Sequence, residues 1–543
     1  MDQTETEPLE GQPEGDLLKQ VVADGRAIDR SLLKRVKPLL SNRNFIHYTI
    51  LIAVFAAIVL LTPSILPRFP LYSVIPALFL LVYIFITRRI FESLVLGIVL
   101  GFLMAVAAGL YVAPEAVYGF EEGELLGFFD AINYSLIKNV ANEDTAWLFI
   151  VCGLMGSFVA LIEQAGGVYA FGRWVAKRAK TKRSTLLWTW VLGLIIFVDD
   201  YLNALTVGSS MAPLTDEHKV SREYLAYIVD STAAPDTTLI PVSTWAVFIA
   251  GLYSQTISEY SLTDTYGGGI RVFISSIPFN FYGWFSLLIV PLTIFGIIPL
   301  FGKLKRAEKR AQETGVLAPP GSEKIDIRGG EALEAKPKAR VLNFFLPIIL
   351  LIVSTLVFDI DLMYGVIFTL GFMFIFYLVQ GLTDGESFFA LALKGFKNML
   401  TPLLMVVLAY MFADGIHTLG FMDYIVDVVG RNVPVWLLPA LVFLVFGLTE
   451  FIMGLSWGMY AIAIPLVTVL AFSLGIHPGL LIAAVVSAGV WGSHVCFYSD
   501  ATILSSSAAG CDNFEHATSQ LPYGVIAAVF ALAGFLIAGI VMA

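Results

Sequence analysis

Two hydrophobic stretches of this chain carry acids and small hydroxyl residues where a membrane-spanning segment would be purely apolar. They are IVDSTAAPDTTLIPVSTWAVF at 228–248 and VWGSHVCFYSDATILSSSAAG at 490–510. Both contain the pattern Asp-x-Thr, two aliphatic residues, two further positions and Ser, which begins at Asp236 in the first stretch and at Asp500 in the second. Carboxylates, hydroxyls and backbone carbonyls are the oxygen ligands that a hard cation prefers. The two stretches therefore predict a pair of cation-binding breaks in membrane-spanning helices.

Two further apolar segments carry acids in the same way. They are FVDDYLNALTVGSSMAPL, which contains Asp199 and Asp200, and LTEFIMGLSWGMYAIAIPL, which contains Glu450. A carboxylate within an apolar segment costs about 2.5 to 3.5 kcal/mol, so each is a candidate functional group. The alternative is that one acid of the pair caps a half-helix. Interrupted hydrophobic segments at corresponding places in two halves are typical of the binding site of a secondary transporter, because unwound backbone at membrane depth must line a cavity.

The composition of the chain indicates that these segments lie in a membrane. The chain is 57% hydrophobic and 14% charged, with a mean hydropathy of +0.80, which excludes a soluble domain and predicts an all-α polytopic membrane protein. The net charge of -10 gives no indication of nucleic-acid binding. We expect neither an enzyme nor a cofactor beyond transported Na+ and H+, because the chain has no zinc-spaced His/Glu set, nucleotide-binding loop or nucleophile elbow. The separate cysteines Cys152, Cys496 and Cys511 are interpreted as reduced and structural.

Segments of about 20 apolar residues are long enough to cross a bilayer. The candidates lie near 45–66, 70–87, 91–113, 146–166, 277–301, 341–358, 362–382, 399–420 and 522–543. Lys and Arg clusters follow the spans that end near 87, 166 and 301, and short basic loops stay on the cytoplasmic side. The acidic stretch 114–144 should then lie outside. We therefore expect a plasma-membrane protein with a cytoplasmic N-terminal tail, 1–44, and its C-terminus outside.

The remaining apolar stretches do not fit simple spans and predict an inverted repeat. Residues 184–214 and 436–474 are interpreted as re-entrant hairpins, because each is longer than one span needs and short for two. Residues 222–253 and 480–507 are interpreted as broken helices that run in opposite directions. The result is an inverted-topology repeat of about 11 full spans. It consists of a first half, 45–301, a cytoplasmic linker, 302–340, and a second half, 341–543.

Three strings of the sequence resemble the NhaC-type family of sodium/proton antiporters. They are FVDDYLNALTVGSSMAPLTDEHKVSREYLAYIVDSTAAP, GLSWGMYAIAIPL and SDATILSSSAAGCDNFEHATSQLPY, and the resemblance extends in order across most of 146–523. It implies the fold of the wider ion-transporter superfamily, in which two hairpins and two broken helices enclose the site. It also implies a cation-coupled antiporter, usually of sodium against protons, with some relatives exchanging organic acids. Analogy with the superfamily implies a homodimer embedded in lipid.

Carried over position by position, the resemblance implies a set of binding residues. The set comprises Asp199, Asp200, Asn203, Asp230, Ser231 and Thr232 in the first half, and Ser456, His494, Ser499, Asp500 and Thr502 in the second. Sodium would be held by Asp200, Asp230, Thr232 and Asp500. Proton-coupled exchange needs a buried carboxylate for which a proton and sodium compete, and Asp230 and Asp200 are the best candidates. His494 can make transport respond to pH, or it can be a buried neutral histidine bonded to a backbone carbonyl.

Several residues depart from the family pattern and favour a larger substrate. Gly492-Ser493-His494 stands where the family usually has Gly-Asp-His, Phe497-Tyr498 replaces smaller residues, and Asp236 replaces an apolar residue. Bulky residues surround the second hairpin, namely Trp457, Met459, Tyr460 and Trp491. An acid with aromatic faces can bind an organic cation or a zwitterionic amino group, although these aromatics can equally be packing residues. The candidate substrate-binding set is Asp236, Ser456, Trp457, His494, Phe497 and Ser499.

Two functions are consistent with these residues. The first is a sodium/proton antiporter that works by alternating access. The second is a sodium- or proton-coupled transporter of a small organic solute, such as an amino acid or a carboxylate. A channel is less consistent with the sequence because it does not require paired broken helices. Glu163 and Asp414, near the ends of their spans, are interpreted as repeat-related residues outside the substrate set.

Overall fold

The computed structural model describes residues 43–87, 89–113, 119–166, 170, 174–175, 178–259, 268–322, 340–359, 361–454 and 456–542. The chain forms two units, Met1–Arg68 and Phe69–Ala543. Almost all of the predicted N-terminal tail, and residues 323–339 of the predicted linker, lie outside the described residues. The regular elements in this part of the chain are helices, with an isolated β-bridge between Val112 and Leu125. The predicted all-α class is therefore confirmed.

Nine helical stretches in the described part of the chain are long and apolar enough to cross a bilayer, or ten if one bent pair is counted as a span. The first unit contributes α2 (Arg43–Ile65), whose apolar window begins at His47. The others belong to the second unit and are Ile90–Ala107, Glu143–Gln164, Leu362–Val379, Gly385–Thr418, Val435–Met453, Ser456–Leu474, Pro478–Val495 and Asn513–Met542. Because a bilayer core about 30 Å thick needs about 20 residues of helix, the chain is a multi-pass membrane protein.

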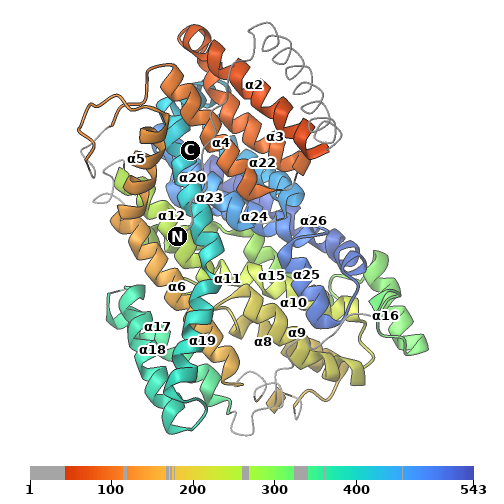
Figure 1. Cartoon of the computed structure of the whole chain (residues 1–543). Coiled ribbons are helices and arrows are strands. Elements are labelled where there is room, and N and C mark those ends of the chain that lie inside the picture. Colours follow the sequence, from red (N-terminus) through yellow and green to blue (C-terminus); the bar gives the residue numbers. More distant parts are fainter. Residues whose placement is uncertain are drawn as a thin grey trace, which may run out of the picture. The chain divides into compact units, whose positions relative to one another are not determined.

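A long column of helix forms one wall of the second unit. Helix α19 (Gly385–Asn398) runs on into α20 (Leu400–Thr418), and α19 packs along α6 (Glu143–Gln164) (Figure 1). The two backbones touch where glycines face each other. A Cβ added to Gly156 would lie 2.4 Å from the carbonyl oxygen of Gly395, and one added to Gly395 would lie 2.2 Å from that of Gly156. Small residues permit this close packing of membrane helices.

The first predicted hairpin corresponds to α8 (Lys182–Ile195) and α9 (Asp200–Glu217). The first predicted broken helix follows it and consists of α10 (Arg222–Thr232), the short α11 (Ala234–Thr237) and α12 (Thr244–Glu259). Hydroxyl side chains of Thr181 and Ser221 accept backbone N–H groups at the starts of α8 and α10, as N-cap residues do. The acids that the sequence singled out therefore lie at helix interruptions.

The second half repeats this succession of elements. Its hairpin is α22 (Leu438–Met453) and α23 (Ser456–Leu474), and its broken helix is α24 (Pro478–Val495) and α25 (Asp500–Ala509). Gly454 closes α22 at a φ of 70°, a left-handed conformation that glycine adopts without steric cost. Both limbs of this hairpin are long and apolar enough to span a bilayer, whereas the described limbs of the first hairpin are not. The two hairpins extend over similar lengths of chain, so they differ chiefly in how apolar their limbs are.

Two helices begin where hydropathy did not place them. Helix α26 (Asn513–Met542) starts well before the predicted span at 522–543 and continues through Pro522. Its polar first turns pack against α10, α24 and α25, so tertiary contacts make this segment helical. Helix α5 (Phe128–Ala141) lies within the stretch that was expected to be only an external connection, and it packs on α4 and α20.

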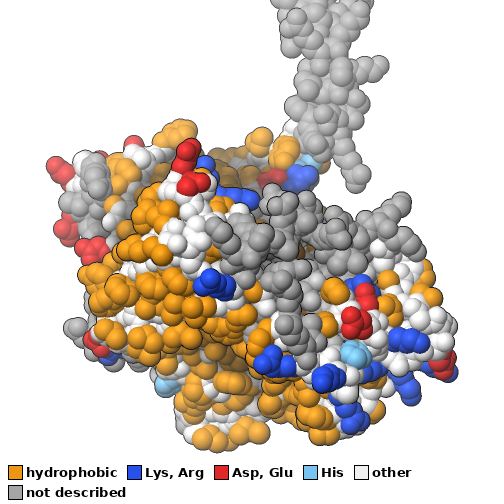
Figure 2. All heavy atoms as spheres, turned by 90° about the horizontal axis from the view of Figure 1, so that it is seen from below, with side chains coloured by type: hydrophobic (Ala, Val, Ile, Leu, Met, Phe, Trp, Pro, Cys, Tyr) orange, Lys and Arg blue, Asp and Glu red, His pale blue; other side chains and the backbone are white. Residues whose placement is uncertain are grey.

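The remaining elements complete the second unit. They are η1 (Pro70–Val74), α3 (Ile75–Thr87), α4 (Ile90–Ala107), α14 (Gly269–Ser276), η2 (Ile277–Phe279), α15 (Phe281–Ile294), α16 (Gly302–Thr314), α17 (Leu342–Val357), α18 (Leu362–Val379), α21 (Phe421–Asn432) and η4 (Val435–Leu437). Figure 2 shows the face seen from below in Figure 1, where basic side chains gather on one side and hydrophobic side chains cover the other. Helix α16 is rich in Lys and Arg and belongs to the predicted cytoplasmic linker.

Candidate functional site

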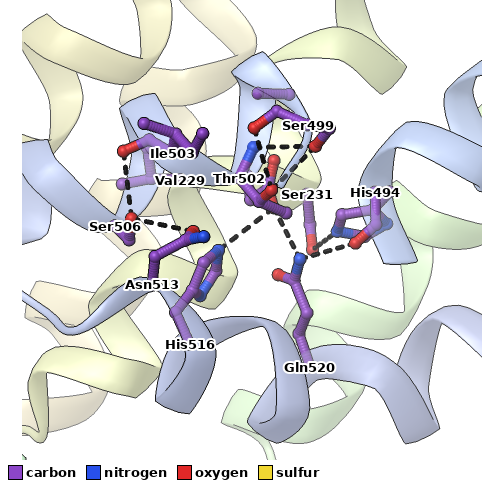
Figure 3. A network of polar contacts seen from close by, with 12 residues as sticks. Val229, Ser231, His494, Ser499, Thr502, Ile503, Ser506, Asn513, His516 and Gln520 are labelled. Atoms are coloured by element: carbon purple, nitrogen blue, oxygen red, sulfur yellow. Dashed lines mark hydrogen bonds and ion pairs between the residues drawn. The ribbon is translucent and has the colours of Figure 1, made fainter. Parts of the chain in front are cut away.

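A buried group of polar side chains, here called the Asp230 cluster, joins α10, α15, α24 and α26. Its members are Asp230, Ser231, Tyr282, His494, His516 and Gln520. Figure 3 shows Ser231 of α10, His494 of α24, and His516 and Gln520 of α26 turned toward one another. The cluster thus brings together the first broken helix, the second broken helix and the C-terminal helix.

Asp230 is held by two side chains from α26. Its Oδ2 accepts a hydrogen bond from Gln520 Nε2 at 2.6 Å and lies 3.1 Å from His516 Nε2. The amide of Gln520 also donates to the backbone carbonyl of His494 at 2.6 Å. Asp230 is 1% exposed and both partners are fully buried. A carboxylate in this position needs such donors, because burying an unpartnered charge is costly.

His494 lies between two hydroxyl groups. Its Nδ1 is 2.7 Å from the Tyr282 hydroxyl, and its Nε2 is 3.1 Å from the Ser231 hydroxyl. Hydroxyls donate or accept as required, so either neutral tautomer of the ring can be satisfied. The ring therefore contacts side-chain hydroxyls and not the backbone carbonyl expected of a structural histidine.

A second series of polar contacts extends this cluster toward α11. Ser487 on α24 donates to Asn280 Oδ1 at 2.8 Å, and Asn280 Nδ2 donates to Thr238 Oγ1 at 2.8 Å. Thr238 is the C-cap residue of α11, and Asn280 is the N-cap of α15. Asp236 lies in α11 itself, buried, with its Oδ2 unpartnered among the described residues. Asp236 is thus at the first break but makes no described contact with the Asp230 cluster.

The other predicted acids form a second group, here called the Asp200 cluster, which comprises Asp199, Asp200, Tyr201, Trp245 and Asp500. Asp199 caps α9 by accepting the N–H of Leu202 at 2.9 Å. Asp200 accepts the indole N–H of Trp245 at 2.8 Å. The Tyr201 hydroxyl donates to Asp500 Oδ2, and Asp500 Oδ1 accepts the N–H of Ala501 at 2.9 Å. The neighbouring acids therefore differ in role. Asp199 caps α9, whereas Asp200 caps no helix and bonds to a side chain.

Asn203 and Thr232 tie the first hairpin to the first broken helix. The Asn203 amide donates to the backbone carbonyls of Gly193, Ile196 and Thr232 at 2.7, 3.1 and 2.9 Å. The Thr232 hydroxyl turns back to the carbonyl of Ile228 at 2.9 Å. A Cβ on Gly193 would lie 2.1 Å from Thr232 Oγ1, so this contact requires glycine. Both predicted residues hold backbone in this conformation, while Asn203 Oδ1 has no described partner.

Ser499 and Thr502 hold the break of the second broken helix. The Ser499 hydroxyl accepts the N–H of Thr502 at 3.2 Å and contacts the Ser493 carbonyl at 2.7 Å. The Thr502 hydroxyl lies 2.7 Å from Ser499 Oγ and donates to the carbonyl of Cys496 at 3.1 Å. These hydroxyls satisfy backbone groups that the break leaves open.

The remaining predicted substrate residues lie around the second hairpin. Ser456 donates to Glu450 Oε1 at 3.2 Å, and this buried acid packs against Gly492 of the second broken helix. The ring of Trp457 packs against those of Trp245 and Phe248, with centroid separations of 5.2 and 4.6 Å. Phe497 packs against Phe451 and Phe514. Trp457 therefore adjoins the Asp200 cluster, and Phe497 packs among phenylalanines.

A cavity of about 600 Å³ opens beside the Asp200 cluster. It lies among α6, α9, α19, α20 and α23, and its lining includes Asp199, Tyr201 and Trp457 together with Glu163 and Lys397. Pockets for small organic ligands typically fall between about 300 and 1,000 Å³. The cavity is therefore large enough for a small organic solute, and two of the predicted site residues, Asp199 and Trp457, line it.

Within the described residues, no three His, Cys, Asp or Glu side chains converge closely enough to hold a metal ion. The predicted sodium ligands Asp200 and Asp500 belong to the Asp200 cluster, and Asp230 belongs to the Asp230 cluster. Thr232 adjoins Asp230 on α10. The predicted set is thus divided between two clusters in this conformation.

Sequence reasoning missed the partners that complete both clusters. His516 and Gln520 lie four residues apart, which places them on the same face of α26. Their spacing of four residues, in a polar stretch just before a predicted span, could have indicated that both side chains face the same partner. Tyr201, which directly follows Asp200, and Trp245, in the stretch 228–248, carry the donors for Asp500 and Asp200. Their pairing across the fold could not be read from local sequence.

The sequence profile of the Na+/H+ antiporter family matches residues 236–540. An uncharacterized protein of Haemophilus influenzae is 27% identical over 506 residues, which cover 86% of this chain and 91% of the relative. Among solved structures, MtrF of Neisseria gonorrhoeae, described as illuminating a class of antimetabolite efflux pumps, matches with a TM-score of 0.55 at 14% identity, over 81% of this chain and 93% of its own. The YdaH transporter of Alcanivorax borkumensis matches with a TM-score of 0.53 at 13% identity, over 81% and 97%. At these identities the two structures establish a shared fold.

Proposed function

Because the chain belongs to the Na+/H+ antiporter family, we propose that this membrane transporter exchanges sodium for protons by alternating access around its two broken helices. The resemblance to sodium/proton antiporters stated from the sequence is confirmed by the family match. We infer the coupled exchange of the two ions from the residues that surround the helix breaks.

The observation that carries the proposal is the environment of Asp230. This carboxylate is buried near the first break and accepts hydrogen bonds through Oδ2, while Oδ1 has no partner among the described residues. A buried acceptor without a donor is costly, and a proton or a hard cation removes that cost. A single buried carboxylate that either ion can satisfy is the element that an exchanger needs.

Alternating access requires parts that move relative to one another. The succession of hairpin and broken helix occurs twice, and an Asp-x-Thr pattern stands at each break, which supports an inverted-topology repeat of about 11 spans. In this arrangement one pair of elements would rock against the other around Asp230 and Asp500. Lys and Arg on α16 support a cytoplasmic linker and N-terminus, with the C-terminus outside. By analogy with the superfamily, we propose a homodimer in the plasma membrane.

The test is pH-gradient quenching in proteoliposomes. An imposed acid-inside gradient should collapse when sodium is added outside, and the effects of lithium and potassium would define selectivity. Asp230→Asn should abolish the sodium response, because the amide holds neither a proton nor a cation as the carboxylate does. Asp423→Asn is a matched control, since Asp423 is exposed on α21. A wild-type protein that moves no protons in response to any of the three cations would refute the exchange.

The cavity lined by Trp457 favours a second candidate function, the sodium- or proton-coupled transport of a small organic solute. Its volume of about 600 Å³ far exceeds what a sodium ion needs, and it presents aromatic and charged side chains of both signs. A tryptophan face and a carboxylate suit an ammonium group, and Lys397 suits a carboxylate. The fold shared with MtrF, described among antimetabolite efflux pumps, also supports this alternative.

The same vesicles distinguish the two candidates. Amino acids and carboxylates would be screened for uptake or efflux under a sodium gradient and under a proton gradient. Solute transport that Trp457→Ala abolishes and Trp284→Ala leaves intact would favour the second function, since Trp284 is exposed on α15. Sodium-dependent proton movement with no solute and no effect of Trp457→Ala would favour the first.

A further inference from the structure

A second cavity of the molecule, here called the Gln255 cavity, has a volume of about 290 Å³ and lies among α3, α12, α20, α22 and α23. Most of its lining is aliphatic or aromatic, and Asn139, Gln255 and Asp414 give it a polar end. We propose that it binds an uncharged amphiphile, a small organic molecule with an amide-like end and an apolar body. The site is distinct from the clusters that carry the proposed exchange, so its test does not depend on that function.

Helices α20 and α23 pass from the cavity of about 600 Å³ to the Gln255 cavity. On α20 the larger cavity ends at Met405 and the smaller one begins at Ala409, and on α23 the corresponding residues are Trp457 and Ala461. Four residues of helix rise about 6 Å. The buried ring of Trp457 packs against Phe248 of α12 at the end of the larger cavity. The two cavities are therefore separate compartments along the same helices.

Gln255 supplies the hydrogen-bonding groups for the polar end of the ligand. The residue is 8% exposed and lines the cavity. Its Oε1 accepts the hydroxyl of Thr145 at 3.0 Å, and its Nε2 donates to Asn139 Oδ1 at 2.9 Å. A primary amide has two N–H donors and two acceptor lone pairs, so these described contacts use one of each. A ligand that carries both a donor and an acceptor, such as a carboxamide, can pair with the other two.

The carboxylate at this end of the cavity is already partnered. Asp414 Oδ2 accepts the hydroxyl of Ser135 at 2.5 Å and the amide of Asn139 at 2.8 Å. Its Oδ1 lies 3.7 Å from Lys138 Nζ. A cationic ligand would therefore gain little from Asp414, and an anionic ligand would be repelled by it. The polar end of the cavity favours an uncharged group.

The rest of the lining suits an apolar body that enters from the bilayer. Side chains such as Leu80 on α3, Phe412 on α20 and Leu466 on α23 form the walls, and burial of apolar surface against them contributes about 25 cal/mol per Å². Val445 on α22 also lines the cavity and is 57% exposed. The cavity therefore reaches the surface of a helix that is long and apolar enough to span a membrane, and an amphiphile dissolved in lipid can enter there.

The experiment is photolabelling of the purified full-length protein in lipid nanodiscs with 4-azidobenzamide, which joins an apolar ring to an uncharged amide. Mass spectrometry of the peptides should place the label on the cavity-lining parts of α20 and α23. Labelling should saturate with probe concentration, and excess benzamide should suppress it far more than benzoate, which has a similar shape and a negative charge. Labelling that rises in proportion to the probe and survives excess benzamide would indicate partition from the lipid and overturn the proposal. Equal suppression by benzoate would overturn the preference for an uncharged end.

A variant of Gln255 tests the polar end. Gln255→Met keeps the length of the side chain but offers no amide, so labelling at a subsaturating probe concentration should fall about tenfold, because two hydrogen bonds to the ligand are lost. Thr145→Val is the matched control, since it removes a partner of Gln255 from a residue outside the cavity lining, and it should be labelled as the wild type is. Equal labelling of the two variants would overturn the role of Gln255.

A cavity-filling variant keeps the proposal testable where Gln255→Met fails to fold. Ile462 on α23 lines the cavity and is half-buried, so the ring of Ile462→Trp should occupy the space for the ligand body. Labelling of the cavity-lining peptides should then fall to the level without light. Ile367→Trp is the control, because Ile367 is 50% exposed on α18, and it should leave labelling unchanged. Wild-type labelling of Ile462→Trp would place the ligand elsewhere and overturn the proposal.

Discussion

The Tyr201 hydroxyl, at the start of α9 in the first hairpin, donates a hydrogen bond to the carboxylate of Asp500, at the start of α25 in the second broken helix. The two residues are almost 300 positions apart in sequence, and their bond joins the two halves of the chain beside the cavity. Asp200, next to Tyr201, turns instead to Trp245. Two neighbouring side chains of the first hairpin therefore bond to different broken helices, Asp200 to the first and Tyr201 to the second.

Tyr201→Phe should weaken this connection while leaving the ring packing in place. A hydrogen bond to a charged group contributes about 1.5 to 3 kcal/mol, so we expect a lower apparent melting temperature and a slower sodium-dependent response in proteoliposomes. Tyr364→Phe is the matched control because that residue is exposed on α18. Equal melting temperature and transport in the two variants would show that the Tyr201–Asp500 bond is dispensable.

The adjacent acids Asp199 and Asp200 should respond differently to substitution. Asp199→Ala removes the N-cap of α9 and should cost about 1 kcal/mol of stability, while Asp199→Asn should retain most of it because asparagine also caps. Asp200→Asn should leave stability nearly unchanged and reduce transport, since Asp200 makes a side-chain contact to Trp245 and caps no helix. Thermal unfolding of each variant in detergent, with transport in vesicles, checks this division. A larger stability loss for Asp200→Asn than for Asp199→Ala would reverse the assignment.

The pair Arg310–Glu223 should stabilise the end of the molecule that carries α16. Arg310 donates to both carboxylate oxygens of Glu223 at 3.0 and 2.9 Å, and the Glu223 side chain is only 3% exposed. Arg310→Ala leaves that acid buried without its partner, which should cost about 1 to 3 kcal/mol after allowance for the partial exposure of the arginine. Lys309→Ala, from an exposed pair with Glu313, should have little effect on the melting temperature. A similar decrease in melting temperature for Arg310→Ala and Lys309→Ala would mean that α16 stabilises the protein through its overall charge and not through the Arg310–Glu223 contact.

Gly395→Ala should separate α19 from α6. The new Cβ would lie 2.2 Å from the backbone carbonyl of Gly156, which cannot move without shifting the helix. Overpacking of this kind costs about 1 to 3 kcal/mol, and it should also change the cavity that both glycines line. Gly385→Ala on the same helix has open space around it and serves as the control. The check is thermal stability together with transport, and a Gly395→Ala protein as stable as Gly385→Ala would refute the close packing.

The exposed cap of α19 should make stability depend on acid pH. Asp384 accepts the backbone N–H and the hydroxyl of Ser387 at 2.8 and 3.0 Å, and these bonds hold the pKa of its carboxyl below the usual value. A depressed folded-state pKa gives stability that is present above the unfolded pKa and lost as pH falls through the folded one. The stability advantage of wild type over Asp384→Ala should therefore shrink in acid.

Asp384→Asn provides the control for this pH effect, because asparagine caps a helix without titrating. Its advantage over Asp384→Ala should stay constant while that of the wild type declines. The measurement is the apparent melting temperature of the three proteins from neutral pH to about 3. A wild-type advantage that does not change with pH would contradict the role of the carboxylate charge.

The sequence alone determined the class of protein and its family. Hydropathy and composition are sums over neighbouring residues, so they identified a multi-pass helical membrane protein without reference to the fold. The strings around Asp199, Asp230 and Asp500 indicated the family that the profile match then confirmed. In the structure each of those acids lies at or near a helix interruption.

Tertiary structure decided which groups these acids contact. His516 and Gln520 meet Asp230 from a helix almost 300 residues away, and no local pattern encodes such a pairing. The polar first turns of α26 precede the span predicted at 522–543, because they are helical through contacts with other helices and not through their own hydropathy. The division of labour between Asp199 and Asp200 also depended on packing. Hydrogen-bond partners depend on how the helices are placed in space. The sequence specifies the side chains of each helix, but local patterns in it do not show which helices lie next to each other.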